Sequence, residues 1–283
     1  MKKILSIIGL AVFILFMAAG IFLIFNFDNV LRAMLQYSAN ASTREYFAGS
    51  IRLSTVHLDQ TLRLHMLHAE GYLQTRAGPV KIQIRSMDSL DPVTHLLFQK
   101  AFRFHFEGAK PAVSPREGLQ GNAVVVTGRK GFVELTSDVV GMNLEDITWF
   151  NPENLAGSSG RMTGTITFKT TYQEETSFRM ALDVKEPGGN LQARFFELLR
   201  PYLPQLGSNA NFHALTNSLS LVNYRKASLQ MYSVDSDKMK VHFHILVPEY
   251  NLNLNVNVEI RTDEKNYFFK LAQMMGFVEV KSQ

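Results

Sequence analysis

Residues 251–260 read NLNLNVNVEI, and this alternation indicates the kind of fold that the chain adopts. Apolar residues stand at every second position, with asparagine or glutamate between them. Successive side chains of a β-strand point to opposite faces, so the segment predicts a strand with one apolar and one polar face. The apolar face has three possible partners: a packed core, a membrane, or a ligand made of hydrocarbon.

The same alternation recurs over most of the chain. It is found in IRLSTVHL at 51–58, TLRLHML at 61–67, PVKIQIRS at 79–86, RMTGTITFKTTY at 161–172 and KMKVHFHILV at 238–247. Few segments with helical periodicity separate these strands, which excludes a βαβ fold. We therefore predict a mainly β protein, with ten to fourteen antiparallel strands that form either an open groove or a sandwich.

Two stretches break the alternation and predict helices. Residues 91–100, DPVTHLLFQK, predict a short helix. A segment at about 190–223 predicts a hairpin of two short amphipathic helices inserted between strands, with 191–200 as its first helix. Polar caps support these assignments. The expected caps are Asp91, Asn190, and Ser208 or Asn209.

The N-terminus predicts a single transmembrane helix. Two lysines precede the 22 residues Ile4–Phe25, in which Ser6 is the only clearly polar side chain. About 20 apolar residues cross a hydrocarbon core of ~30 Å. The competing prediction is a cleavable signal peptide ending near Ala18-Ala19-Gly20, but the apolar run continues beyond these small residues. Representative anchor residues are Ile4, Leu10, Phe16 and Phe25.

The anchor predicts the organisation of the whole chain. Residues 1–27 form the anchor with a cytoplasmic N-terminus, since lysines favour that side. Residues 28–49 form a membrane-proximal helical linker, and 50–283 form a β-rich domain beyond the membrane. In the linker the apolar residues share one helical face. These are Val30, Leu31, Met34 and Leu35.

Composition and motifs give no indication of chemistry. The net charge is only +4 and there are no cysteines, which argues against a nucleic-acid surface and excludes thiolate metal sites. His242 and His244 share the polar face of a predicted strand, and no phosphate-binding loop, nucleophile elbow or metal-binding helix motif occurs. We expect a protein without enzymatic activity, metal or cofactor.

The layout of the chain resembles that of the AsmA-like proteins of the bacterial envelope. The resemblance covers 1–70 and 155–262. It lies in a basic start, a single anchor and four segments: IRLSTVHLDQTLRL, GSSGRMTGTITFKTTY, FRMALDVKEPGGNLQARFFELLRPYLP and VPEYNLNLNVNVEI. It implies an inner-membrane protein with a periplasmic β-groove that moves phospholipid or supports outer-membrane assembly. Members that bridge the envelope are far longer. About fourteen strands span only ~65 Å, so one copy of this chain is too short to bridge an envelope.

We therefore expect an inner-membrane-anchored periplasmic protein whose apolar β-groove contacts or transfers phospholipid acyl chains, with other envelope proteins as further partners. The alternative is a scaffold of an envelope or secretion complex, with the apolar face sealed as a core. The expected lipid contacts lie on the last two strands. They are Val241, Phe243, Ile245, Leu252, Leu254, Val256 and Val258.

Overall fold

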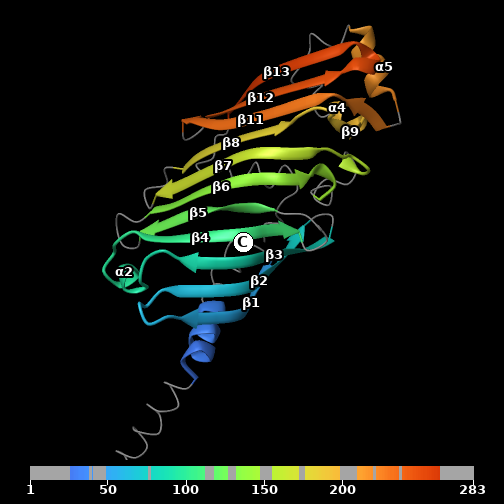
Figure 1. The fold of residues 1–283 in the computed structure, drawn as a ribbon. Helices are drawn as coiled ribbons and strands as arrows, with labels where there is room; N and C mark the ends of the chain where they lie inside the picture. Colours follow the sequence, from blue (N-terminus) through green and yellow to red (C-terminus); the bar gives the residue numbers. More distant parts are fainter. Residues whose placement is uncertain are drawn as a thin grey trace, which may run out of the picture.

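The chain folds around one large antiparallel sheet, seen in a computed structural model (Figure 1). The structure describes residues 26–37, 40, 49–75, 78–111, 118–126, 132–146, 155–171, 176–197, 209–218, 221–235 and 238–261. Eleven strands lie in the order β1-β2-β3-β4-β5-β6-β7-β8-β11-β12-β13. Every neighbouring pair is antiparallel, which confirms the predicted mainly β class with few helices.

The strands of the large sheet contain 8 to 12 residues each, and most predicted alternating segments coincide with a strand to within a few residues. Those of the large sheet are β1 (Gly49–Leu58), β2 (Leu64–Thr75), β3 (Gly78–Ser89), β4 (Phe102–Pro111), β5 (Leu119–Val126), β6 (Phe132–Asn143), β7 (Arg161–Thr171), β8 (Thr176–Val184), β11 (Lys226–Asp235), β12 (Lys238–Val247) and β13 (Leu252–Arg261).

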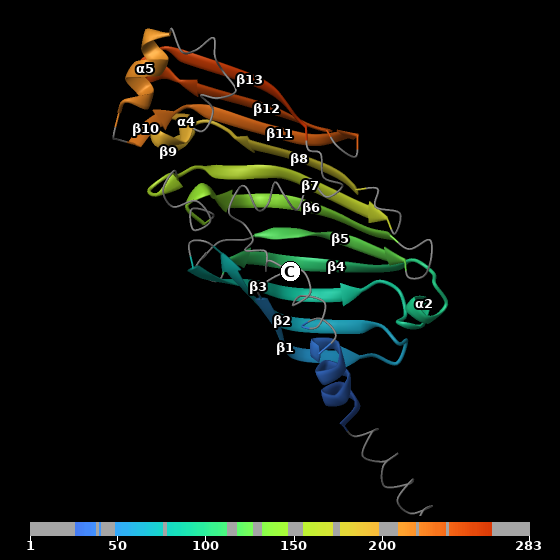
Figure 2. The same ribbon diagram turned by 180° about the vertical axis from the view of Figure 1, so that it is seen from behind.

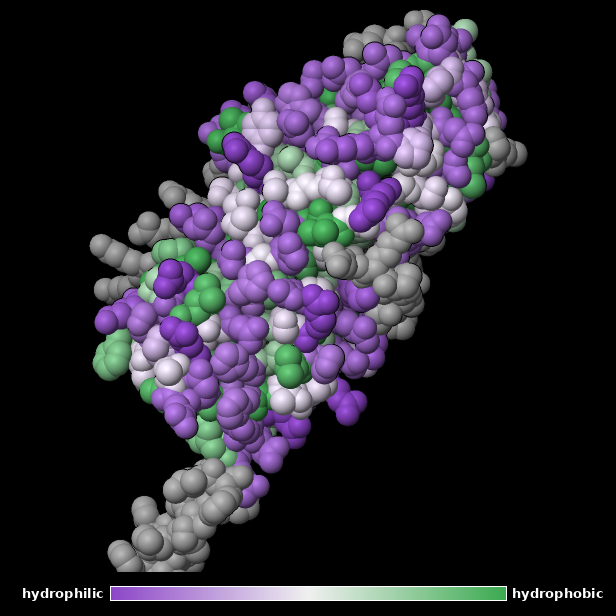
Figure 3. Space-filling view, viewed as in Figure 1, coloured by the Kyte–Doolittle hydropathy of each residue, from purple (hydrophilic) through white to green (hydrophobic). Residues whose placement is uncertain are grey.

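Alternation along each strand gives the sheet an apolar and a polar face. In β13, Leu252, Leu254 and Val256 are buried, whereas the asparagines between them are exposed. We call the apolar side the inner face and the other side the outer face. The side of the molecule visible in Figure 3 is predominantly hydrophilic, with hydrophobic side chains only in small separate patches.

A small insert between β8 and β11 covers the inner face at one end of the sheet, and we call it the cap. It consists of β9 (Gly189–Gln192), α4 (Arg194–Glu197), α5 (Ala210–Thr216) and β10 (Leu221–Tyr224). Figure 2 shows these elements together beside β11–β13. A 3-10 turn, Pro248–Tyr250, joins β12 to β13 next to the cap.

The predicted helical hairpin at about 190–223 is only partly correct. Asn190 does not cap a helix, because it lies in β9 and is paired with Asn223 of β10. Two short strands therefore frame the helices, and the first helix begins at Arg194 rather than at Leu191. The predicted N-cap residue Asn209 is confirmed, since its side chain accepts hydrogen bonds from the backbone N–H groups of the first turn of α5.

The cap and the sheet share one hydrophobic core. Phe196, Phe212 and Leu215 of the cap are almost completely buried in the same cluster as Phe243 and Ile245 of β12. The Tyr224 hydroxyl of β10 donates a hydrogen bond of 2.9 Å to the carbonyl of Ser159, and burial raises the pKa of Tyr224 to about 12. The cap is thus held by both apolar and polar contacts.

The short helix predicted within 91–100 is present as α2 (Thr94–Leu97), but its N-cap residue is not Asp91. Val93 precedes the helix instead. The Asp91 carboxylate is buried and receives three hydrogen bonds from the backbone and guanidinium of Arg103, at 2.8 to 2.9 Å. These bonds lower the pKa of Asp91 to about 2.

A helix over 26–37 lies beside β1 at the opposite end of the sheet from β13 (Figure 1). Polar side chains at every fourth position, three in this helix and the fourth at Asn40 beyond it, form hydrogen bonds with the free edge of β1. Asp28 accepts from the Leu58 N–H, Arg32 donates to the Ser54 carbonyl, Gln36 accepts from the Leu53 N–H and Asn40 accepts from the Ile51 N–H. This covers an edge that would otherwise pair with other strands.

The helix 26–37 overlaps the first part of 28–49, and the assignment of that segment as a membrane-proximal linker stays a prediction. Of its predicted apolar face, Val30, Leu31 and Leu35 are half-buried, whereas Met34 is exposed. The predicted anchor residues Ile4, Leu10, Phe16 and Phe25 lie outside the described residues. Among the helices that the structure does describe, none has the length and apolar character needed to span a bilayer.

Candidate functional site: an apolar row along the inner face

One row of inner-face side chains crosses all eleven strands of the large sheet. Each member lies directly opposite the next on the neighbouring strand. We call it the central row. In order from β1 to β13 it consists of Val56, Met66, Met87, Phe106, Gly121, Ser137, Ile166, Met180, Met231, Val241 and Val258.

The central row is mostly apolar, and six of its eleven members are half-buried whereas the other five are buried. Nine of its eleven positions carry apolar side chains larger than alanine. Met66, Met87, Ile166 and Met180 are half-buried, as are both valines at the β13 end. Methionine is unbranched and polarisable, so a surface rich in it adapts to ligands of varied shape. Strands ~4.8 Å apart give the row a length of roughly 50 Å.

The two small residues of the row lie next to each other in the middle of the sheet. A Cβ atom at Gly121 would stand 2.0 Å from the carbonyl oxygen of Thr136, so only glycine fits there. Ser137, which is almost completely buried, donates its hydroxyl to the Gln120 carbonyl at 3.2 Å. The hydroxyl therefore has its hydrogen-bond partner within the sheet, so the row presents no unpaired polar group at this position.

The structure separates the seven expected lipid contacts into two groups. Two of them, Val241 and Val258, belong to the central row and are half-buried. The other five are buried, and all five belong to the core cluster shared with the cap. They are Phe243, Ile245, Leu252, Leu254 and Val256. Lipid contact remains a prediction for all seven, and the first group is the more accessible.

Sequence analysis did not identify the rest of the central row. Alternation predicted that each strand has an apolar face, but the register of ten strand pairs is needed to align the residues. The alternation of inner and outer side chains along β4 is also shifted by one residue near Gly108, where the register between β4 and β5 changes. Such β-bulges move side chains between faces and are not visible in a period-two pattern.

The outer face carries a polar row over β1–β4 that provides a second candidate site. His57, His65, Asp88 and His105 lie opposite one another on successive strands. Both ring nitrogens of His65 are bound by carboxylates, with Nδ1 2.8 Å from Asp88 and Nε2 3.3 Å from Asp59.

These contacts favour a structural role for His65. The hydrogen bond to Asp88, followed by that to Asp59, raises the pKa of His65. A ring with a carboxylate at each nitrogen is stabilised in its cationic form, and neither nitrogen is free to act as a base. Among the described residues, no group of three or more His, Asp or Glu side chains is arranged to hold a metal ion.

Comparison of the chain with protein-family models, with curated proteins and with solved structures finds no match.

Proposed function

We propose that this protein binds phospholipid acyl chains along the central row and passes them along the sheet without chemical change. The protein would be anchored in the inner membrane by its N-terminus, with the sheet in the periplasm. The resemblance to the AsmA-like proteins, together with the predicted anchor, supports this placement. The role would be to supply phospholipid for biogenesis of the outer membrane.

The observation that carries the proposal is the continuity of the central row across eleven strands. Each CH₂ group kept from water contributes about 0.8 kcal/mol, so a half-covered apolar surface can replace part of the bilayer interior. The row has no charged member, so a chain moving along it meets no site that traps it strongly. Movement would therefore be passive and follow the lipid gradient.

A scaffold is the second candidate function, and the cap favours it. Five expected contacts are sealed beneath the cap, as in an ordinary core. In a scaffold the remaining inner face would bind proteins rather than lipid. The half-buried part of the central row is the region where the two functions differ, so the test is placed there.

The test uses adjacent residues of β7 that point to opposite faces. Ile166 belongs to the central row, and Thr165 is exposed on the outer face. A photo-reactive phenylalanine derivative is placed at either position in the full chain, in cells, and the adducts are identified by mass spectrometry. We expect phospholipid adducts from position 166 and none from position 165.

Charge substitutions provide a second readout on the same pair. Ile166→Lys should reduce the phospholipid that co-purifies with the full chain by severalfold, while Thr165→Lys should leave it unchanged, because only the former places a charge in the apolar row. Circular dichroism checks that both variants fold. Protein adducts at position 166 with no lipid adduct would favour the scaffold and contradict lipid transfer.

A further inference from the structure

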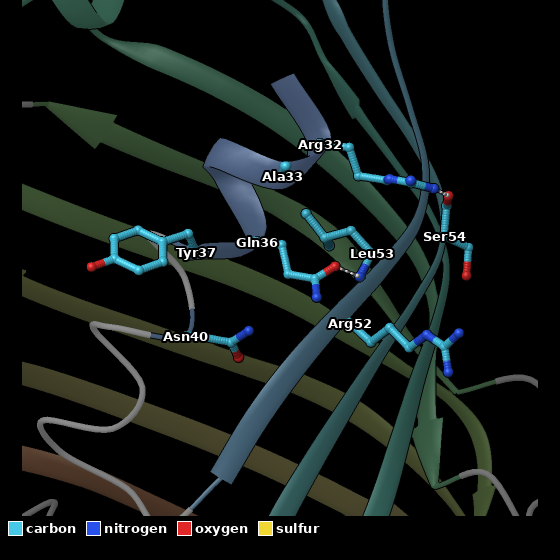
Figure 4. Close-up of a pocket in the computed structure, with 8 residues that line it drawn as sticks. All are labelled: Arg32, Ala33, Gln36, Tyr37, Asn40, Arg52, Leu53 and Ser54. Atoms are coloured by element: carbon cyan, nitrogen blue, oxygen red, sulfur yellow. Dashed lines mark hydrogen bonds between the residues drawn. The ribbon is translucent and has the colours of Figure 1, made fainter. Parts of the chain in front are cut away.

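A pocket of about 770 Å³ lies between the helix 26–37 and strand β1. Its volume falls in the range of roughly 300–1,000 Å³ that is usual for small-molecule sites. The pocket combines cationic, amide, hydroxyl and apolar groups. Its lining residues are Arg32, Ala33, Gln36, Tyr37, Asn40, Arg52, Leu53 and Ser54 (Figure 4).

Two arginines and a serine lie along the edge of β1 and form a cationic rim there. Figure 4 shows Arg32 reaching from the helix to this edge, while the side chains of Ser54 and Arg52 extend to the side of β1 that faces away from the helix. Arg32 crosses from the helix and donates one hydrogen bond of 2.9 Å to the Ser54 carbonyl. A guanidinium has five N–H donors, so most donors of Arg32 remain for an anion.

The carboxylates close to this rim among the described residues are held by other groups. Glu70 is the cross-strand neighbour of Arg52, but its carboxylate is 2.7 Å from Lys81 and also accepts from the Tyr72 hydroxyl. Asp28, one helical turn before Arg32, pairs with His57 at 2.8 Å. None of the eight lining residues is acidic.

The apolar part of the pocket continues into the inner face of the sheet. Leu53 lines the pocket and lies opposite Ala69, which in turn lies opposite Ile84. These three residues form a short apolar row beside the central row, on the same strands β1–β3. The pocket thus has cationic groups at the edge of β1, and Leu53 on the opposite side of the strand leads toward the central row.

We propose that this pocket receives the phosphate of a phospholipid head group, with the phosphate at the edge of β1 between Arg32 and Arg52 and the acyl chains passing around this edge to the side of Leu53. Arginine forks match phosphate oxygens in paired hydrogen bonds, and the Ser54 hydroxyl adds a third donor. This inference rests on the proposed function, since it names the end of the sheet at which lipid enters and the group by which lipid is recognised.

The test measures affinity of the purified full chain for three probes by native mass spectrometry and calorimetry. The probes are dioctanoyl phosphatidylglycerol, dioctanoylglycerol without phosphate, and inorganic phosphate. We expect the phospholipid to bind at least ~10-fold more tightly than dioctanoylglycerol, since one charge-assisted contact accounts for about that factor. Arg52→Gln should remove most of this difference while leaving dioctanoylglycerol binding unchanged.

Two further variants make the result specific. Arg179→Gln removes an exposed arginine on the outer face of β8 and should change nothing. Arg32→Gln should act like Arg52→Gln, while also losing the contact with Ser54. Arg52 donates no such bond to the β1 edge, so Arg52→Gln tests the site without disturbing the helix.

Each outcome separates this inference from the proposed function. Equal binding of the two lipids by the wild-type chain would overturn the phosphate site but leave acyl-chain binding intact. Inorganic phosphate binding as tightly as the phospholipid would overturn the assignment to a lipid head group. Failure of every lipid to bind would overturn the proposed function as well.

Discussion

Ile245→Ala tests whether the cap seals the inner face at the β13 end. Ile245 is completely buried, lies between Ala227 and Leu254 on the neighbouring strands, and belongs to the cluster that includes Phe212 of the cap. The substitution removes three carbons, worth about 2.4 kcal/mol of transfer free energy at ~0.8 kcal/mol each. The cavity left behind raises the expected loss of stability to about 3–4 kcal/mol.

The comparison variant is Leu229→Ala on β11. Leu229 faces the same side of the sheet but is only half-buried, so its truncation should cost about 1–2 kcal/mol. Thermal unfolding of the full chain in detergent, followed by circular dichroism, provides the measurement. At about 2–4 °C per kcal/mol, Ile245→Ala should lower Tm by roughly 10 °C and Leu229→Ala by less than half of that. Equal shifts would show that the cap leaves Ile245 accessible and would refute the assignment of a sealed core.

Two further predictions concern titratable groups on the N-terminal half of the sheet. Asp91→Ala should cost about 2 kcal/mol at neutral pH, because the Arg103 guanidinium loses its buried acceptor. Since the pKa of Asp91 is lowered to about 2, the wild-type advantage in urea unfolding should persist down to pH about 4 and disappear as the pH falls toward 2; an advantage independent of pH would contradict this. His65→Gln should destabilise the chain most below pH ~6.5, because a raised pKa means that the stabilisation by Asp88 is present in acid and is lost as the pH rises through the folded-state pKa. A difference in unfolding free energy that grows toward alkaline pH would show that the neutral ring, not the cation, makes the stabilising contacts.

Much of the secondary structure was predictable, because alternation is a local property of the strand. The segment 251–257 predicts its own buried and exposed positions, and both agree with β13, while Val258 is half-buried. The N-cap residue of α5 was also predictable, since the Asn209 side chain accepts from N–H groups only two and three residues ahead. The cap strands were not, because Leu191 forms a strand through its pairing with Val222, 31 residues away.

The candidate site was predictable only in part. Val241 and Val258 were identified on their strands, but their alignment with Met66 or Ile166 depends on every register between them. The cationic pocket was not predicted at all. Arg32 and Arg52 lie in different elements and come together only because the helix 26–37 binds the edge of β1.

The amino-acid order alone was sufficient to establish a chain of antiparallel strands, each with one apolar face, because side-chain direction along a strand depends only on near neighbours. Three-dimensional packing was required to settle which part of the apolar face is sealed by the cap and which part stays half-open. It also placed the polar side chains of the helix 26–37 on the backbone of β1. These features arise from contacts between residues far apart in the chain, whose free energy depends on register and burial and has no signature in a local pattern.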